Sequence, residues 1–160
     1  MGFGLGLDLR LGQAKSVVAS GSSGVFNDPD AVYSVRKVIS SYTGNCMLVE
    51  RTSDSTTQDI GFDGNGDLDT AAIAAFCRGT TGKVRTWYDQ SGSNNLTQTT
   101  QTNMPEIFFS GSVITENGNP AVEFVGSFSH YLDASSAANY SQPNTIATVS
   151  KRGSGLTFTE

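Results

Sequence analysis

The sequence is poor in the residues that build metal and redox sites. Its 160 residues include two cysteines and a single histidine. Neither Cys46 nor Cys77 belongs to a C-x-x-C pair, and His130 is the only imidazole, so neither a disulfide framework nor a zinc or iron–sulfur site is expected. We expect both thiols to be free and buried, as small apolar side chains usually are. His130 is expected on the surface or in a loop rather than as a base, and no cofactor is predicted.

Charge and long apolar runs are also scarce. Charged residues make up 16% of the chain, and the formal net charge is −5. A nucleic-acid partner is not expected, because phosphate backbones need clustered lysine and arginine. No segment approaches the ~20 consecutive apolar residues of a membrane-spanning helix, so no span is predicted. The N-terminus lacks a basic leader, and glycine and charged residues interrupt its apolar residues, so a secretory signal is not predicted either.

Glycine and neutral polar residues are abundant instead. The chain has 18 glycines and is 37% hydrophobic, which is typical of a β protein with many turns and one core. Runs of β-branched and aromatic residues bounded by turn residues predict short strands. The Glu-Asn-Gly-Asn segment at 116–119 predicts a hairpin turn. The predicted strands are residues 46–50, 84–88, 107–109, 113–115, 121–124, 145–149 and 156–158.

Two short helices are predicted among the strands. The first has Asp28 as its N-cap and Pro29 as its first residue, and it ends at Gly44. Apolar side chains at three- and four-residue spacing give this segment one apolar face. They are Val32, Val35, Val38, Ile39 and Tyr42. The second helix has Asp67 as its N-cap, and its apolar face consists of Leu68, Ala72, Ala75 and Phe76.

A glycine-rich acidic loop leads to the second helix. Oxygen-bearing side chains alternate there as calcium ligands do in an EF-hand, at Asp63, Asn65, Asp67 and Asp69. The sixth and twelfth positions of that pattern hold Leu68 and Ala74 in place of the glycine and the bidentate glutamate. We therefore prefer a turn that ends in a helix N-cap to a calcium site, and no metal is predicted.

The first 27 residues have a pattern of their own. Residues 3–11 alternate with a period of two, as in a half-buried strand, and residues 16–24 are a serine- and glycine-rich linker. The strand is either an arm that docks on another chain or the first strand of the same domain. We divide the chain into a docking arm with linker at 1–27 and a β domain at 28–160. The edge of the strand at 156–158 would be covered by another chain or by further polypeptide.

One segment leaves a predicted strand with two aromatic residues and enters a polar loop. Aromatic faces beside Asp, Asn and Gln side chains match the C–H faces and hydroxyl pairs of sugars. The candidate glycan-binding residues are Trp87, Tyr88, Asp89, Gln90, Asn94 and Asn95. In the alternative, which we favour, Trp87 faces the core while Asp89 and Gln90 fix the turn through backbone hydrogen bonds. Trp87 and Tyr88 point to opposite faces of a strand, so they cannot line one site without a bulge.

Several blocks resemble, in order, the front part of the catalytic domain of the fungal α-L-arabinofuranosidase B family. They lie at 33–37, 41–44, 51–54, 58–62, 69–71, 76–77, 87–92 and 117–121, and they cover residues 31–125. The resemblance implies a mainly β, concanavalin-like (laminin-G-like) sandwich of the jelly-roll type. Similar blocks occur in phage tail and fibre proteins with such a sandwich. The amino-acid sequences of the blocks in this chain resemble the phage versions more than the fungal enzymes.

The sequence departs from the enzymes that it resembles. In that family Cys77 has a disulfide partner a few residues on, and Gly82 stands in the matching place here. The family's nucleophile and acid/base carboxylates lie in the later half of the sandwich, which no segment of this chain matches. The resemblance therefore implies an architecture without the chemistry, and residues 28–160 are expected to be the front part of a longer domain.

Three functions follow from these observations. The expected one is a structural virion protein of a tailed phage: a homotrimeric fibre, tail or collar appendage. It would dock on other virion proteins through 1–27 and present its sandwich to host-surface polysaccharide. The first alternative is a free glycan-binding lectin module. The second, an arabinofuranosidase-type hydrolase, would need a spaced pair among Glu50, Asp59, Asp89 and Glu123. We do not expect an enzyme, and the sequence does not identify the glycan or the docking partner.

Overall fold

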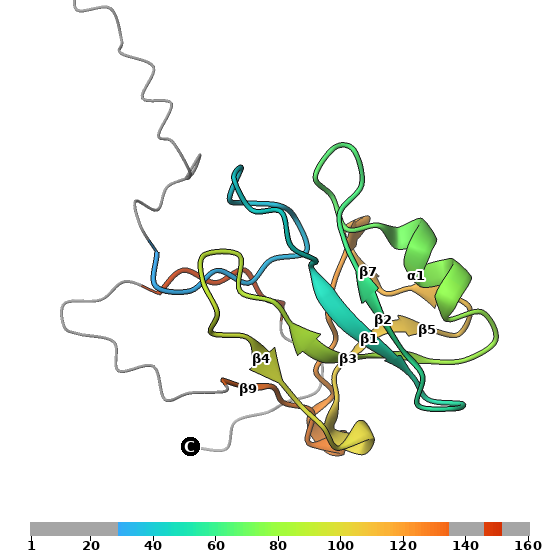
Figure 1. The fold of residues 1–160 in the computed structure, drawn as a ribbon. Helices are drawn as coiled ribbons and strands as arrows, with labels where there is room; N and C mark the ends of the chain where they lie inside the picture. The colour runs from blue at the N-terminus through green and yellow to red at the C-terminus, as the bar shows by residue number, and fades with distance from the viewer. Residues whose placement is uncertain (1–28, 135–145, 152–160) are drawn as a thin grey trace, which may run out of the picture.

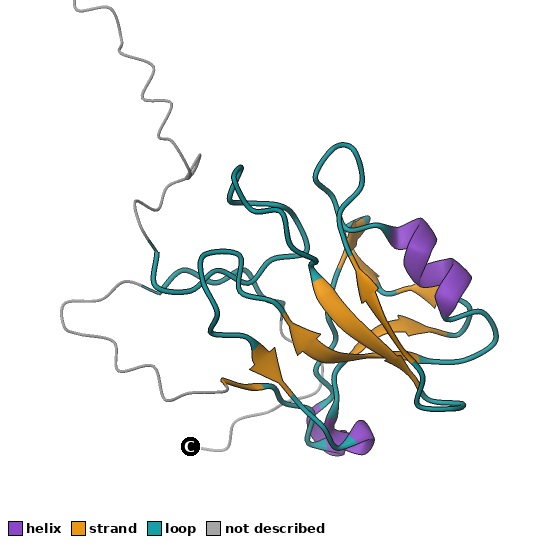
Figure 2. Ribbon diagram, in the orientation of Figure 1, coloured by secondary structure: helices purple, strands orange, loops and turns teal. Residues whose placement is uncertain are grey.

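The computed structural model describes residues 29–134 and 146–151. These residues form a mainly β structure of antiparallel strands with one short α-helix (Figures 1 and 2). The prediction of a mainly β fold is therefore confirmed. The predicted arm at 1–27 and the predicted strand at 156–158 lie outside the described residues.

Seven strands form one antiparallel sheet around β3. The order is β2-β1-β3-β4-β9, and β5 also pairs with β3 and carries β6 on its far side. A separate hairpin consists of β7 and β8. The strands are β1 (Met47–Arg51), β2 (Thr57–Ile60), β3 (Gly82–Trp87), β4 (Leu96–Thr97), β5 (Glu106–Phe109), β6 (Ser112–Val113), β7 (Thr115–Glu116), β8 (Asn119–Pro120) and β9 (Asp133–Ala134).

The strands predicted at 46–50, 84–88 and 107–109 are confirmed as β1, β3 and β5. The strand predicted at 113–115 is divided between β6 and β7, which belong to different sheets, and Ile114 lies in neither. The hairpin turn is confirmed as well, since Asn117 and Gly118 have φ values of 50° and 79°, as a type I′ turn requires. The strand predicted at 121–124 is wrong, because only Glu123 forms a bridge there, to Glu106. Residues 146–149 are not a strand either. The edge strand β2 went unpredicted because only its last residue, Ile60, is buried.

Helix α1 (Thr70–Phe76) is the second predicted helix, but its N-cap is Asp69 and not Asp67. The Asp69 carboxylate accepts a hydrogen bond from the N–H of Ala72 at 2.8 Å. Asp67 instead pairs with Arg36, with Nε and Oδ1 2.6 Å apart. Two 3-10 turns, η1 (Gln101–Asn103) and η2 (Gly126–Phe128), complete the regular structure. None of the helices in the described ranges is long and apolar enough to cross a membrane.

The helix predicted from Asp28 to Gly44 is wrong: residues 29–44 contain no helix. Most of the backbone groups that are hydrogen-bonded in this segment pair with distant parts of the chain, and a single backbone turn bond, from the N–H of Tyr42 to the carbonyl of Ile39, is local. The N–H of Lys37 donates to the carbonyl of Gly66, and the carbonyl of Val35 accepts from the N–H of Leu68. The apolar spacing that suggested a helix rests largely on β-branched residues, which have low helix propensity and do not resist this alternative.

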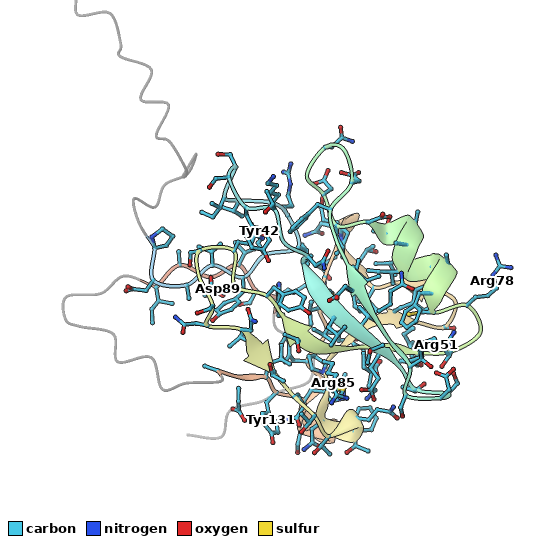
Figure 3. All side chains as sticks on the ribbon, viewed as in Figure 1. Tyr42, Arg51, Arg78, Arg85, Asp89 and Tyr131 are labelled. Atoms are coloured by element: carbon cyan, nitrogen blue, oxygen red, sulfur yellow. The ribbon has the colours of Figure 1, made fainter. Side chains whose placement is uncertain are left out.

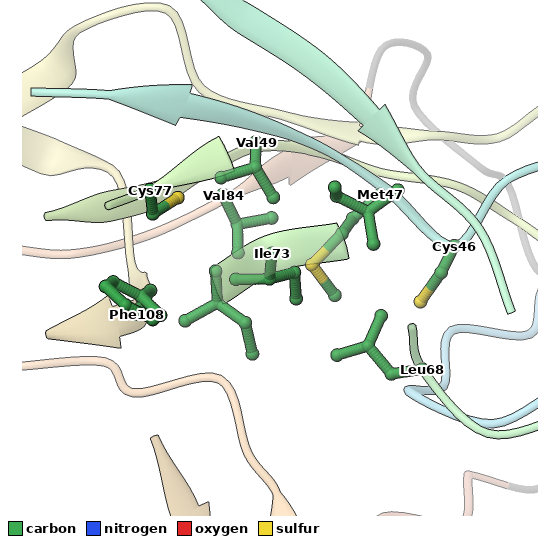
Figure 4. Close-up of a cluster of buried hydrophobic side chains, with 10 residues drawn as sticks. Cys46, Met47, Val49, Leu68, Ile73, Cys77, Val84 and Phe108 are labelled. Carbon is green, nitrogen blue, oxygen red and sulfur yellow. The ribbon is translucent and has the colours of Figure 1, made fainter. Parts of the chain in front are cut away.

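The core lies between the sheet and α1 (Figure 4). Ile73 of the helix packs with Met47 and Val49 of β1 and with Val84 of β3, and all four are fully buried. Both cysteines join this cluster as free, buried thiols, as predicted. Burial raises the pKa of Cys46 to about 12 and that of Cys77 to about 11. Their thiolates are therefore disfavoured at neutral pH.

His130 follows η2 in a loop, as predicted, but it is buried rather than on the surface. Its Nδ1 accepts a hydrogen bond from the N–H of Val125 at 3.1 Å, and its ring stacks at a tilt against Phe128. Its Nε2 is buried without a partner among the described residues. The imidazole is therefore part of the packing of the η2 loop.

Candidate functional site

The candidate glycan-binding residues lie where β3 ends and the chain turns toward β4. Trp87 is the last residue of β3, and the other five occupy the loop that leads to Leu96. This loop lies beside residues 32–39, which come from a distant part of the sequence. Figure 3 labels Asp89 within this region.

Asp89 is the most constrained of the six residues. Only 1% of its surface is exposed, and its carboxylate accepts four hydrogen bonds. Oδ1 accepts from the N–H of Val32 at 2.8 Å, and from the N–H and hydroxyl of Ser91 at 2.9 and 2.7 Å. Oδ2 accepts from the N–H of Asn94 at 3.2 Å. The carboxylate thus closes its own loop and ties it to the segment that begins near residue 32.

Gln90 makes a second set of contacts to the same segment, and it is 3% exposed. Its Oε1 accepts from the N–H groups of Val38 and Ile39 at 2.7 and 3.4 Å. Its Nε2 donates to the carbonyls of Ser34 and Arg36 at 3.2 and 2.7 Å. The Gln90 side chain therefore replaces the partners that a helix would have supplied to these backbone groups.

Trp87 and Tyr88 point to different surroundings, as successive residues of a strand do. Trp87 packs against the core cluster, and its Nε1 is buried without an acceptor in the described part of the chain. The Tyr88 hydroxyl donates to Oδ1 of Asp59 on β2 at 2.6 Å. Burial and the neighbouring Asp59 carboxylate raise the pKa of Tyr88, so its hydroxyl stays protonated as a donor.

The two asparagines complete the closure of the loop. Oδ1 of Asn95 accepts from the N–H of Asp89 at 3.0 Å. The carbonyl of Asn94 accepts from the hydroxyl of Tyr33. These contacts have the form of the turn-fixing alternative, in which Asp89 and Gln90 bind backbone groups and Trp87 faces the core. The glycan-binding assignment stays a prediction, now restricted to the more exposed rim of the loop.

The Asp89 carboxylate makes stability depend on pH. Burial alone would raise the pKa of Asp89, but the hydrogen bonds from Val32, Ser91 and Asn94 outweigh it and lower the pKa below its ordinary value. Such a group adds stability above the unfolded pKa of about 3.9 and loses it as the pH falls through the folded value. We expect the urea concentration at the unfolding midpoint of the wild type to fall when the pH is lowered below about 4. The fall should be smaller for Asp89→Asn. Equal pH slopes for the two proteins would contradict this assignment.

The acidic loop at 63–69 divides its side chains among separate tasks. Oδ1 of Asp63 accepts from the N–H groups of Asn65 and Asp67 at 2.8 and 3.0 Å, which forms a tight turn. Asp67 pairs with Arg36, and Asp69 caps α1. Among the described residues, no three His, Cys, Asp or Glu side chains gather closely enough to hold a metal ion.

A row of charged side chains crosses the face of the sheet that is opposite the core. This row was not predicted from the sequence. Glu50, Lys83 and Glu106 are consecutive cross-strand partners on β1, β3 and β5. Glu50 is 2% exposed and accepts from Arg85 Nη1 at 2.5 Å and from Gln101 Nε2 at 2.8 Å. Lys83 Nζ lies 3.5 Å from Glu106 Oε1. The alternation of Lys83 and Arg85 within a strand was the signal available for this row.

Comparison with known proteins gives one family and several relatives. The family model described as "Alpha-L-arabinofuranosidase B, catalytic" matches residues 24–151. An α-L-arabinofuranosidase of Hypocrea jecorina is 38% identical over 91 residues, which cover 53% of this chain and 18% of that protein. The α-L-arabinofuranosidase B of Aspergillus oryzae is 37% identical over 112 residues, which cover 61% of this chain and 22% of that protein.

Solved structures of similar proteins cover a comparable part. A GH54 α-L-arabinofuranosidase soaked with a cyclic sulfate inhibitor matches 48% of this chain and 19% of its own, at 33% identity and a TM-score of 0.43. An arabinofuranosidase in complex with arabinofuranosyl-α-1,2-xylobiose matches 51% of this chain and 18% of its own, at 34% identity and a TM-score of 0.40.

The aligned part is a small share of each relative. The alignments span about a fifth of the length of the curated relatives. These matches say nothing of phage proteins, so the phage resemblance stays a prediction. The family model, in contrast, covers well over half of this chain, and it agrees with the resemblance carried by the ordered sequence blocks. The chain belongs to the α-L-arabinofuranosidase B catalytic family.

Proposed function

We propose that this chain is a glycan-recognising module of the arabinofuranosidase B family that binds carbohydrate without cleaving it. The described sheet would be part of a concanavalin-like sandwich. The observation that carries the proposal is the state of the four carboxylates named as hydrolase candidates from the sequence: two are buried in structural hydrogen bonds, and the other two lie far apart.

Glu50 and Asp89 are the two buried carboxylates. The oxygens of Glu50 accept hydrogen bonds from Arg85 and Gln101, and those of Asp89 accept four hydrogen bonds. A nucleophile or an acid/base must approach the glycosidic bond, which neither side chain can do while it is held in this way. Their arrangement supports a structural role.

Asp59 and Glu123 are the two exposed carboxylates. Asp59 lies on β2, and Glu123 bridges to Glu106 on β5. The path from one to the other crosses β1, β3 and β5, which amounts to four strand spacings, or about 19 Å. Retaining and inverting glycosidases place their carboxyl groups about 5 Å and roughly 6.5–9.5 Å apart. This pair does not meet either requirement.

The proposal predicts saturable carbohydrate binding by the purified wild-type chain. An array of oligosaccharides, probed with the chain and followed by calorimetric titration of the glycans that it retains, measures this directly. We expect dissociation constants in the micromolar to millimolar range, as for a small open site with few hydrogen bonds. A chain that retains no glycan on the array would contradict the proposal.

We also propose a place for this module, in a phage particle as a homotrimeric appendage docked through residues 1–27. Two features support this place: the sequence pattern of residues 1–27, and the amino-acid sequences of the blocks that resemble phage tail and fibre proteins. Mass spectrometry of purified particles and light scattering of the free chain test it together. A chain that is absent from particles and monomeric in solution would oppose it.

A second candidate function is hydrolysis of α-L-arabinofuranosides, which the family membership favours. The relatives that carry this name extend far beyond the part that the chain matches. Release of 4-nitrophenol from 4-nitrophenyl α-L-arabinofuranoside, a compound soaked into crystals of one relative, would support it. We expect no release above the rate in buffer.

A further inference from the structure

An open cleft lies away from the loop that follows β3. It has a volume of about 560 Å³ and is formed by the turn after β1, the segment between α1 and β3, and the β5–β6 turn. This volume is within the range of sites that take small molecules. Its lining includes Thr52, Ser53, Thr80, Thr81, Phe109 and Ser110.

Phe109 presents an aromatic face at this cleft. It ends β5, and 55% of its surface is exposed, whereas its neighbour Phe108 is 2% exposed and belongs to the core. The alternation of the strand therefore turns one phenyl ring inward and leaves the next one in solvent. An exposed ring with open space beside it can stack on the C–H face of a sugar.

Hydroxyl-bearing side chains line the same cleft. Those of Thr52 and Thr80 lie 3.0 Å apart and share a hydrogen bond, and the Thr80 hydroxyl also accepts from the N–H of Ser53 at 3.1 Å. This pair fixes the two sides of the cleft relative to each other. The hydroxyls of Ser53, Thr81 and Ser110 have no partner within the described residues, so each can donate to a ligand and accept from it.

The cleft has no charged side chain in its lining. Arg51 is next to Thr52 in the sequence, but its guanidinium pairs with Asp54 and lies over the ring of Phe76, 5.0 Å from its centroid. Arg78, which precedes Gly79, is exposed and has no ion pair among the described residues, but it is not part of the lining. An anionic ligand such as a sulfated or uronic sugar would therefore find no cation within the cleft itself. Free hydroxyls beside an apolar ring match a ligand that is itself uncharged and rich in hydroxyls.

We propose that this cleft is the binding site for a neutral oligosaccharide, with Phe109 as the stacking platform and the hydroxyls of Ser53, Thr81 and Ser110 as its hydrogen-bonding groups. The inference rests on the proposed function and locates it. It places glycan recognition at the start of β3 and not in the loop at 87–95, which follows the end of that strand. Gly82 at the start of β3 pairs with Phe108, the neighbour of the platform residue Phe109.

The test is an array of neutral, sulfated and uronic-acid-containing oligosaccharides, probed with the wild type and four variants. We expect the wild type to retain neutral glycans, Phe109→Tyr to retain the same ones, and Phe109→Ala to bind about tenfold more weakly or not at all. Phe128→Ala removes another aromatic side chain that is 61% exposed, and it should bind as the wild type does. Because Phe109 is largely exposed, thermal unfolding of Phe109→Ala should match that of the wild type.

The outcomes separate the two proposals. Retention of neutral glycans with equal affinity by the wild type and Phe109→Ala would overturn the cleft and leave glycan recognition standing. Preference for sulfated or uronic sugars would overturn the neutral class. Retention of no glycan by the wild type would overturn both. Loss of binding in Ser53→Ala, which removes one free hydroxyl without touching the ring, would further support the cleft.

Discussion

Replacing Asp89 by alanine is expected to lower the free energy of unfolding by about 4 kcal/mol. The change leaves three backbone N–H groups and one hydroxyl without their acceptor, in a region where the lost side chain was 1% exposed. Hydrogen bonds to a charged group contribute roughly 1.5–3 kcal/mol each, and water entering the space would satisfy part of the freed donors. Urea unfolding followed by circular dichroism measures the difference.

Asp59→Ala is the matched control for this change. It removes a carboxylate that is exposed and accepts one hydrogen bond, from the Tyr88 hydroxyl. We expect it to cost less than about 1 kcal/mol. The contradicting result is that Asp89→Ala lowers the free energy of unfolding no more than Asp59→Ala does and leaves its slope against urea concentration unchanged. In that case Asp89 would not hold the loop to the segment at 32–39. A steep loss confined to Asp89→Ala would support the role that its hydrogen bonds indicate.

Gly82 is the only glycine in the described strands, and two substitutions of nearly equal size should have opposite effects there. A Cβ at this position would lie 2.5 Å from Sγ of Cys77 and 3.1 Å from Cβ of Phe108. Gly82→Ser is therefore expected to lower the free energy of unfolding by about 2–3 kcal/mol through overpacking of the core. Gly82→Cys should instead form a disulfide with Cys77 under oxidising conditions.

The disulfide would close a short loop, from the end of α1 to the start of β3. By chain entropy alone such a loop contributes about 2 kcal/mol relative to the reduced form. The measurement is the urea midpoint of Gly82→Cys with and without a reductant. In Gly82→Cys combined with Cys77→Ser, the reductant should have no effect. A redox-independent midpoint in Gly82→Cys alone would show that the two side chains do not meet as the close approach indicates.

This contact gives a physical basis to one departure noted in the sequence. The family resemblance implies a disulfide partner for Cys77 at the position of Gly82, and the fold brings these two residues together. Without a Cβ at Gly82, the Cys77 thiol occupies the space and is buried. Packing thus occupies the place of the bridge that the resemblance implies.

Much of the strand pattern could be predicted, because apolar residues of these strands are buried in the core, as Met47 and Val49 are in β1 and Ile107 and Phe108 in β5. The local spacing of apolar residues wrongly predicts a helix at 28–44. Backbone groups of this segment bind Asp89, Gln90 and Gly66, which lie tens of residues away in the sequence. Tertiary hydrogen bonds of this kind override weak local propensity, and no periodicity reveals them.

The structure brings the six residues predicted at 87–95 together in one loop, and only part of their contacts could be predicted from the sequence. An Asp and a Gln after a strand can hold a turn, which was predicted, but their contacts reach well beyond that turn. The cleft at Phe109 had no signal in the sequence. Its three walls come from segments near residues 52, 80 and 110, and only the pairing of β5 with β3 brings them together.

The most direct test of recognition without hydrolysis is one NMR experiment on arabinofuranosyl-α-1,2-xylobiose, the compound bound in the structure of one relative. The purified chain is mixed with an excess of this oligosaccharide, and the anomeric signals are followed over days. We expect binding without hydrolysis, so that the arabinofuranosyl signal stays intact and no free arabinose appears. Free arabinose that accumulates in proportion to the protein concentration would contradict it.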